Sequence, residues 1–252
     1  MYHQLAHLYD WPGSLDFSEK ILSRDLAVFT ELNLQPPARI LDLACGTGTL
    51  SLALAQKGYE IIGVDISAEM LTQAKAKQQE QEAAGQPLKL RWLEADMRYF
   101  LLDEPVDAVV CHYDSLNHLS NETELRGTFV QVAQALKSGG SFLFDLNTLE
   151  NYQTFWQGKD TYEGPNYRLK TESSFNEDLN KAEVQFKVEE YNDEGELDFH
   201  SEQVFEHYFN ETAVEKYLMA ADFYEIQWSP FNPVDEIPAE FPLKTFWRCK
   251  RR

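Results

Sequence analysis

One short stretch constrains the fold of this chain more than any other. It reads Ile40-Leu41-Asp42-Leu43-Ala44-Cys45-Gly46-Thr47-Gly48-Thr49-Leu50. The pattern predicts a buried strand, a glycine turn and then a helix over residues 50–56, capped by Thr49. Gly46 and Gly48 allow the backbone to turn sharply and to approach a ligand closely. Because a carboxylate in an apolar strand is costly to bury, we expect Asp42 to pair with the turn's own backbone or with a cationic ligand group.

The residues around the glycine turn indicate which ligand it holds. A dinucleotide-binding turn has a third glycine three residues after the second, and this chain has Ser51 at that position. The next apolar strand ends at Asp65, 19 residues after Gly46, where a carboxylate binds the two hydroxyls of a ribose. A ribose-binding acid without a full pyrophosphate cradle favours a nucleoside that carries no phosphates.

These segments resemble the class I S-adenosylmethionine-dependent methyltransferases. The first motif of that family has the form acid-x-x-x-Gly-x-Gly, which the segment from Asp42 to Gly48 matches. Three further segments match it: Gly63-Val64-Asp65-Ile66-Ser67 followed by Met70, Ala95-Asp96-Met97, and Gly139-Gly140. The resemblance covers residues 38–148 and implies an enzyme that uses S-adenosylmethionine as its cofactor.

Strands and helices alternate after the first motif. Apolar strands are expected at residues 59–64, 88–93, 106–111 and 141–146, with helices at 68–84 and 122–136. This order predicts an α/β fold with right-handed crossovers, and the resemblance implies a Rossmann-like, mostly parallel seven-stranded sheet with helices on both faces. Ligands bind such sheets at the carboxyl ends of the strands. The sequence places Asp65, Asp96, the loop 112–114 and Asp145 at such ends, which predicts one common site.

Residues 149–209 interrupt this alternation. Strands are expected at 168–175, 181–191 and 197–209, with a turn at 192–195. We therefore divide the chain into a cofactor-binding domain, residues 1–148 and 210–252, and an inserted antiparallel β subdomain, residues 149–209. Residues 159–209 include 14 acidic and 5 basic side chains, a net charge of −9. The inserted sheet is thus a solvated acidic face, a cover over the acceptor pocket, or the contact of a homodimer.

The two ends of the chain complete the expected fold. Leu5 and Leu8 predict a short helix that Pro12-Gly13 breaks, and a long helix follows over residues 15–34. In the resembling family an N-terminal Tyr-Asp often folds over the cofactor, which assigns Tyr9 to the site by resemblance. Asn210 is expected to cap a helix over 211–221. Strands at 223–228 and 244–249, joined by the proline-rich loop 230–242, close the sheet.

The parts of S-adenosylmethionine suggest a role for each matching residue. Asp65 would accept from the ribose hydroxyls, and Ile66 and Met70 would enclose the adenine. Asp96 would accept from the adenine amino group, next to the backbone N–H of Met97. The backbone of Ala44 and Gly46 would approach the methionine end, where Asp42 would help to hold the ammonium. The expected cofactor-binding residues are Tyr9, Asp42, Ala44, Gly46, Gly48, Asp65, Ile66, Met70, Asp96, Met97 and Tyr113.

Methyl transfer from a sulfonium is an in-line displacement of an activated donor. The protein therefore mainly supplies proximity, orientation and exclusion of water. Tyr113 is expected to line the transfer channel. A base is useful where the acceptor is an ammonium or a hydroxyl, and the candidates are His118 and His207, followed by His112 and Glu206.

Composition disfavours several classes of partner and site. A net charge of −20 disfavours binding to nucleic acids and to anionic membranes. The loop from Cys111 to Ser115 also lacks the Asp/Asn-Pro-Pro-Tyr sequence that amide- and adenine-directed relatives use. Three cysteines without CxxC spacing predict no disulfide framework and no metal site. Without a visible signal peptide or transmembrane run, we expect a cytoplasmic protein.

The expected function is transfer of a methyl group to the nitrogen or oxygen of a small-molecule acceptor. Two other functions fit part of the pattern. One is a non-catalytic module that binds S-adenosylmethionine, and the other is an NAD-dependent oxidoreductase, which Ser51 disfavours.

Overall fold

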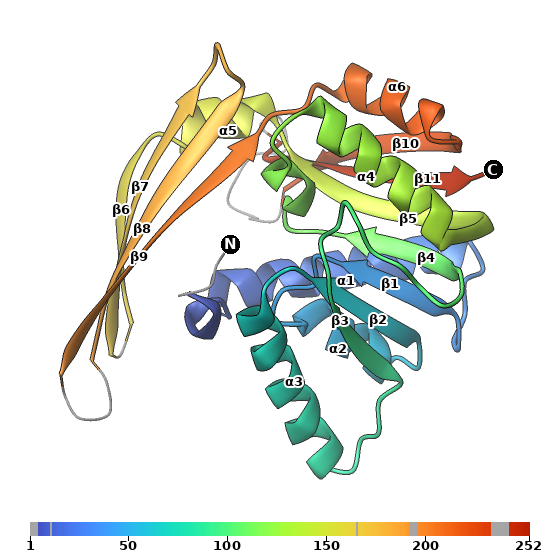
Figure 1. Ribbon diagram of the computed structural model, residues 1–252, viewed down its shortest axis with the longest axis horizontal. Coiled ribbons are helices and arrows are strands. Elements are labelled where there is room, and N and C mark those ends of the chain that lie inside the picture. The colour runs from blue at the N-terminus through green and yellow to red at the C-terminus, as the bar shows by residue number, and fades with distance from the viewer. Residues whose placement is uncertain (1–4, 11, 165, 192–195, 233–241) are drawn as a thin grey trace.

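The chain forms two separate sheets (Figure 1). The computed structural model describes residues 5–10, 12–164, 166–191, 196–232 and 242–252, without the side chains of 12–14. The strands are β1 (Arg39–Leu43), β2 (Glu60–Asp65), β3 (Leu90–Glu94), β4 (Val106–Cys111), β5 (Leu136–Asn147), β6 (Gly158–Glu163), β7 (Tyr167–Asn176), β8 (Lys181–Tyr191), β9 (Leu197–His207), β10 (Phe223–Phe231) and β11 (Lys244–Arg251). The helices are α1 (Pro12–Glu31), α2 (Thr49–Gln56), α3 (Ala68–Ala83), α4 (Glu122–Ala135), α5 (Leu149–Phe155) and α6 (Glu211–Ala220), with 3₁₀ turns η1 (Ala6–Leu8) and η2 (Ser115–His118).

The larger sheet has seven strands in the order β10-β11-β5-β4-β1-β2-β3. Strands β3, β2, β1, β4 and β5 pair in parallel, and β11 runs antiparallel to both of its neighbours, β5 and β10. This arrangement confirms the predicted mostly parallel sheet, in which β11 is the one reversed strand. The strand order changes direction beside β1, so the carboxyl ends of β1, β2 and β4 meet around a crevice.

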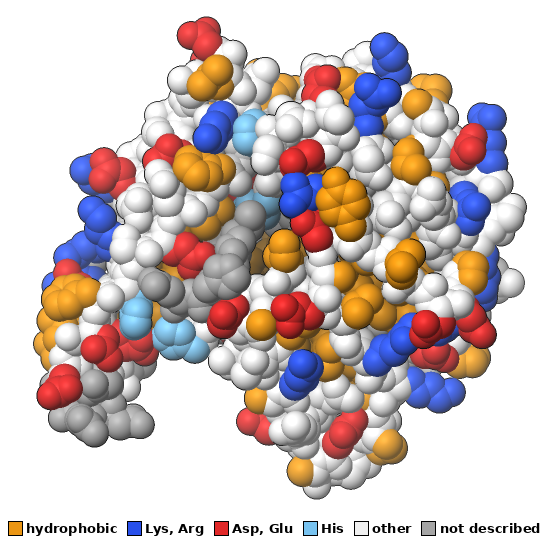
Figure 2. All heavy atoms as spheres, viewed as in Figure 1, with side chains coloured by type: hydrophobic (Ala, Val, Ile, Leu, Met, Phe, Trp, Pro, Cys, Tyr) orange, Lys and Arg blue, Asp and Glu red, His pale blue; other side chains and the backbone are white. Residues whose placement is uncertain are grey.

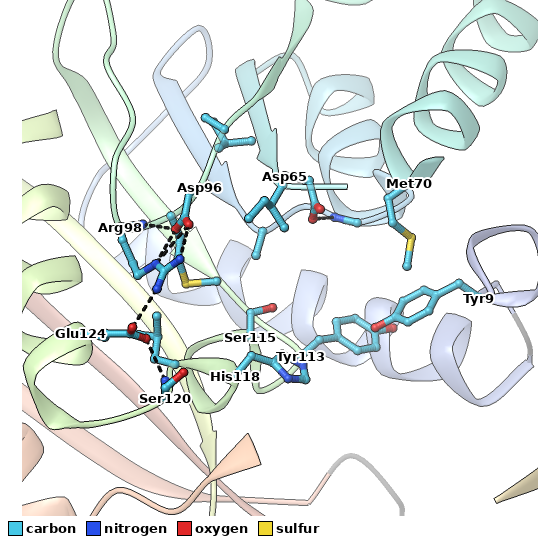
Figure 3. Close-up of a pocket in the computed structure, with 17 residues that line it drawn as sticks. Tyr9, Asp65, Met70, Asp96, Arg98, Tyr113, Ser115, His118, Ser120 and Glu124 are labelled. Carbon is cyan, nitrogen blue, oxygen red and sulfur yellow. Dashed lines mark hydrogen bonds and ion pairs between the residues drawn. The ribbon is translucent and has the colours of Figure 1, made fainter. Parts of the chain in front are cut away.

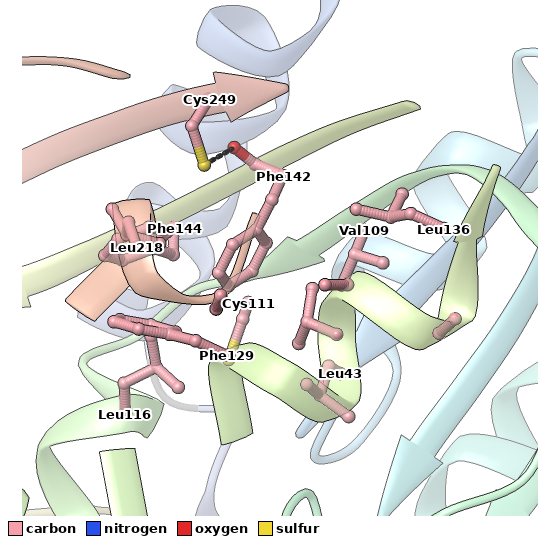
Figure 4. Packing of buried hydrophobic residues seen from close by; sticks show 14 of the residues in the cluster. Leu43, Val109, Cys111, Leu116, Phe129, Leu136, Phe142, Phe144, Leu218 and Cys249 are labelled. Carbon is pink, nitrogen blue, oxygen red and sulfur yellow. Dashed lines mark hydrogen bonds between the residues drawn. The ribbon is translucent and has the colours of Figure 1, made fainter. Parts of the chain in front are cut away.

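Both faces of this sheet are covered by helices, as predicted. Along β1, Ile40 packs with α1 and α2 on one face, and Leu41 and Leu43 pack with α4 and α6 on the other. Figure 4 shows the second cluster, in which Phe129 of α4 meets the side chains of the central strands. Because successive strand residues point to opposite faces, near-continuous apolar strands supply both cores at once.

The inserted segment forms an antiparallel sheet in the order β6-β7-β8-β9, which projects from the body of the molecule (Figure 1). The strands β7, β8 and β9 confirm the three expected strands, whereas β6 and the short helix α5 were not predicted. Tyr152 of α5 stacks on Phe175 of β7, with ring centroids 5.2 Å apart, and anchors the base of the sheet. Strand β6 is exposed along its length, so it carries no apolar alternation from which a strand could be predicted.

Two expectations about helix starts were wrong. Thr49 does not cap α2: the N-cap is Gly48, in a left-handed conformation and without a side-chain hydrogen bond. Helix α1 begins at Pro12, where we expected Pro12-Gly13 to separate two helices. Proline fits the first turn of a helix, because the backbone N–H that it lacks would have no hydrogen-bond partner within the helix at that position. The expected cap at Asn210 is confirmed, and α3 is capped by Ser67. The expected turn 192–195 and residues 233–241 of the expected loop lie outside the described residues.

Candidate active site

A cavity of about 290 Å³ lies at the carboxyl ends of β1, β2, β3 and β4 (Figure 3). Asp96, Asp65 and Met70 lie on one side of it, and His118, Tyr113 and Tyr9 lie on the other. Most of the residues expected at the site line this cavity, namely Tyr9, Ala44, Gly46, Asp65, Ile66, Met70, Asp96, Met97, Tyr113 and His118. Asp42 lines a smaller adjoining cavity of about 50 Å³, whereas Gly48 and His207 are not among the lining residues of either.

Asp65 ends β2 with its carboxylate already fixed. Oδ2 accepts a hydrogen bond from the Gly46 amide, and Oδ1 accepts one from the Ser67 amide, each at 2.8 Å. Burial raises the pKa of Asp65, and these backbone donors oppose that shift. Because each carboxylate oxygen accepts more than one hydrogen bond, Asp65 can still receive two hydroxyls of a ligand.

The two glycines of the turn have different reasons to be glycine. Gly46 has φ +54°, and a Cβ there would meet nothing within 4 Å, so its backbone borders open space in the cavity. Gly48 has φ +75°, and a Cβ there would lie 2.3 Å from the ring of Trp92. A Cβ added at Gly63 would lie almost as close to the same ring, at 2.4 Å. Gly48 therefore serves close packing of β3 against the turn, a role that the sequence did not suggest.

Asp42 has a partner that the sequence analysis did not consider. Its Oδ2 accepts a hydrogen bond of 2.5 Å from Ser51 Oγ, and both side chains are buried. Burial raises the pKa of Asp42 to about 6, although the Ser51 hydroxyl opposes the shift. Ser51, which stands where a dinucleotide-binding turn has its third glycine, thus supplies a hydrogen bond to the buried carboxylate of Asp42. Contact with a ligand ammonium through the smaller cavity stays a prediction.

The side of the cavity beyond Asp65 carries an ion-pair network. The guanidinium of Arg98 binds Asp96 at 2.6 Å and Glu124 at 2.8 Å, and this pairing holds the pKa of Asp96 below its usual value. Arg98 and Glu124 also line the cavity but were not predicted; the only available signal was the position of Arg98 two residues after Asp96. Nearby, Met70 is buried, and Ile66 is 53% exposed and open to a ligand.

The N-terminal segment bridges the motif turn and the inserted sheet. Asp10 accepts hydrogen bonds from Thr47 Oγ1 at 2.6 Å and from Lys77 Nζ at 2.7 Å. On its other side, His7 Nε2 lies 2.8 Å from a carboxylate oxygen of Glu190 in β8. Tyr9, between these anchors, lines both cavities, in agreement with its expected place.

Tyr113 reaches the cavity from a backbone turn that is unusual for side-chain-bearing residues. Tyr113 and Asp114 both have positive φ, 61° and 50°, and such conformations cost energy that the surroundings must offset. The Tyr113 hydroxyl lies 2.9 Å from Ser18 Oγ, and the Asp114 amide donates to Asp145 Oδ2 at 3.0 Å. These contacts fix the phenol at the junction of the two cavities.

A buried ionic network supports this turn from behind. His112 contacts Asp25 at 3.0 Å and Asp145 at 3.2 Å, and Lys244 contacts Asp145 at 3.0 Å and Asp114 at 3.1 Å. Burial alone would lower the pKa of His112, but the two carboxylates raise it to about 10. His112 is therefore held as an imidazolium with both nitrogens bonded to carboxylates, and it is poorly suited to act as a base.

The other two candidate histidines differ in position. His118, in η2, lines the larger cavity, and its Nδ1 lies 3.0 Å from the Phe205 carbonyl oxygen. His207 ends β9, and its backbone carbonyl accepts a hydrogen bond from Asn117. Of the two, His118 is the one that the structure brings to the cavity.

The comparisons with known proteins agree with this geometry. Residues 40–140 match a family model described as a methyltransferase domain. Over 119 residues the chain is 43% identical to the putative methyltransferase YqeM of Bacillus subtilis, a match that covers 47% of this chain and 46% of the relative. The structure also superposes on a crystal structure of an S-adenosylmethionine-dependent methyltransferase from Clostridium acetobutylicum with a TM-score of 0.80. The two sequences are 24% identical, and the match covers 99% of this chain and 98% of that chain.

Residues 40–140 thus match a methyltransferase domain, and the chain as a whole has the fold of an S-adenosylmethionine-dependent methyltransferase. These matches support the expected family, the class I S-adenosylmethionine-dependent methyltransferases, and its cofactor. The chain is also 31% identical over 139 residues to a glycine/sarcosine N-methyltransferase of Halorhodospira halochloris, a match that covers 54% of this chain and 49% of that protein. The chain thus spans about half the length of these curated relatives.

Two further features of the fold concern membrane spans and metal sites. Within the part of the chain that the structure describes, no helix has the length and apolarity needed to cross a membrane. Among those same residues, no group of three or more His, Cys, Asp or Glu side chains is placed to hold a metal ion.

Proposed function

We propose that this protein transfers the methyl group of S-adenosylmethionine to the nitrogen of a small-molecule amine, with a hydroxyl oxygen as the alternative acceptor. The supporting observation is the larger cavity itself. One wall carries the strand-end residues suited to a nucleoside, Asp65 and Asp96, and the facing wall carries His118 and Tyr113. A cavity with both walls can hold a donor and an acceptor in contact.

The donor would lie along the strand ends. Asp65 would bind the ribose, Ile66 and Met70 would enclose the adenine, and Asp96, oriented by Arg98, would accept from the adenine amino group. The smaller cavity beside Asp42 would receive the methionine end. The sulfonium would then fall near Tyr9 and Tyr113, which line both cavities.

The acceptor would approach from the side of Tyr113, His118 and the inserted sheet. An amine is favoured because the chain carries a net charge of −20 and because a similar protein is named a glycine/sarcosine N-methyltransferase. Figure 2 shows acidic side chains on the inserted sheet and on the body. In this proposal the inserted sheet, residues 149–209, covers the acceptor pocket. Replacing the sheet with that of a relative should then change acceptor preference without changing cofactor affinity.

Calorimetry and an acceptor screen test this function. Titration with S-adenosylmethionine and S-adenosylhomocysteine should show binding, and titration with NAD should show none. Transfer of a labelled methyl group to amines should then exceed transfer to hydroxyl compounds. Tight cofactor binding without transfer to any acceptor would favour the non-catalytic module. A cytoplasmic location, a homodimer and the absence of a nucleic-acid partner stay predictions.

A further inference from the structure

A single arginine holds the carboxylate of the acid that follows β3. Arg98 donates to Asp96 from its backbone N–H at 2.8 Å, from Nε at 3.0 and 3.1 Å, and from Nη2 at 2.6 Å. A guanidinium that contacts both oxygens fixes the position and the plane of a carboxylate, which a point charge does not. Asp96 is therefore held in one orientation at the wall of the larger cavity.

The guanidinium is itself held from a second element. Nη1 of Arg98 donates to Glu124 Oε1 at 2.8 Å, and Glu124 Oε2 accepts from the Ser120 amide at 2.9 Å. Figure 3 shows Arg98 between the two carboxylates. Glu124 lies in the first turn of α4, and Ser120 lies in the loop between η2 and that helix. Arg98 thus joins the end of β3 to α4 and cannot leave Asp96 without giving up a second ion pair.

The held carboxylate keeps the capacity to accept from a ligand. A carboxylate has about four acceptor sites, and three N–H groups of Arg98 bond to Asp96. The Asp96 side chain is 22% exposed and lines the larger cavity. The hydrogen bonds from Arg98 hold the pKa of Asp96 below its usual value, against the effect of burial. An ionised carboxylate only accepts hydrogen bonds, whereas a protonated carboxyl also donates one.

We propose that Arg98 is a positioning residue that acts through Asp96 and makes the cavity selective for a 6-aminopurine base. This inference rests on the placement of adenine beside Asp96 in the proposed function. The amino group of adenine donates to an acceptor at that place. Hypoxanthine instead presents a carbonyl oxygen there and carries its N–H donor at the neighbouring ring nitrogen, N1.

The arginine explains how one carboxylate can distinguish the two bases. A mobile carboxylate could shift to the N1–H of hypoxanthine, and a protonated carboxyl could donate to its carbonyl oxygen. Arg98 opposes both, because its planar fork fixes the position of Asp96 and its charge keeps that side chain ionised. A base that lacks the amino donor then leaves its carbonyl oxygen against a fixed negative charge.

Calorimetry with S-adenosylhomocysteine and S-inosylhomocysteine, which differ only in the base, tests this selectivity without any acceptor. The wild type should bind the adenine ligand about 10- to 100-fold more tightly, as expected for one hydrogen bond to a charged group. Arg98→Met should narrow this ratio about tenfold, and Arg98→Lys, which keeps the charge without the fork, should recover only part of it. Arg91→Met is the matched control, because Arg91 of β3 forms an exposed ion pair with Asp103 and is not among the residues that line the two cavities.

The ratio of the two affinities does not depend on the folded fraction of a variant, because both ligands meet the same molecules. A merely structural role of Arg98 would therefore leave the ratio unchanged, and equal ratios in Arg98→Met, Arg91→Met and the wild type would overturn the inference. So would full recovery of the ratio by Arg98→Lys.

The same experiment separates this inference from the proposed function. Equal wild-type affinities for the two ligands, in a protein that methylates amines, would refute the role of Arg98 and leave the proposed function intact. The expected ratio and its loss in Arg98→Met, in a protein that methylates no amine, would support the role of Arg98 and refute the proposed methyl transfer. Binding of neither ligand would overturn both.

Discussion

The hydroxyl of Ser51 donates a 2.5 Å hydrogen bond to the buried carboxylate of Asp42. Asp42 belongs to β1 and Ser51 to the first turn of α2, so this bond joins the two elements that flank the glycine turn. Ser51→Ala would leave a buried carboxylate without its donor, and unfolding should become easier by about 1–3 kcal/mol. Denaturant unfolding measures the change, with Thr72→Ala as the control, because Thr72 is an exposed residue of α3. Equal midpoints for the two variants would contradict this role.

Asp42→Asn should stabilise the free protein and weaken cofactor binding. The pKa of Asp42 is raised from 3.8 to about 6, so its protonated form contributes stability that is fully present below pH 3.8 and is lost as the pH rises through 6. Asparagine keeps an acceptor for Ser51 but carries no charge, so the gain should grow with pH and reach about 1–3 kcal/mol at pH 7. Thermal unfolding across pH 4 to 8 checks this, and a gain that shrinks with rising pH would contradict it.

Asp65→Ala should weaken binding of S-adenosylmethionine by about 1–3 kcal/mol, because hydrogen bonds from the ribose to a charged acceptor are lost. Calorimetry at fixed pH measures the affinity. Asp103→Ala provides the control, since that side chain is 83% exposed. If Asp65→Ala bound the cofactor as tightly as the control does, the residue would have no place in the ribose site.

Gly48→Ala and Gly85→Ala separate steric clash from backbone strain. Both glycines have positive φ, but a Cβ at Gly48 would lie 2.3 Å from Trp92, whereas a Cβ at Gly85 meets nothing within 4 Å. Gly85→Ala should therefore lose about 1 kcal/mol of stability from the left-handed backbone alone. Gly48→Ala should lose about 1–3 kcal/mol more from overpacking. Similar losses in both, measured by urea unfolding, would show that Trp92 moves aside freely.

Local patterns predicted much of the large sheet and of the cavity wall that the strand ends form. Strand β4 and helix α3 followed from their apolar residues, and Asp65 followed from its distance to Gly46. The misses have physical causes: Thr49 was assigned as a cap although the left-handed Gly48 already occupies that position, and β6 has no buried side to produce alternation.

The sequence by itself determined that a glycine turn, an acid at the end of the second strand and an acid after the third would meet at one edge of a parallel sheet. This follows because strand ends in such a sheet converge whatever the loops contain. Only the tertiary structure decided which side chains stand beside His118, since Glu206 and Phe205 arrive from an inserted sheet about ninety residues further along the chain. Contacts between segments so far apart leave no local periodicity, so the surroundings of His118 became visible only when the chain was folded.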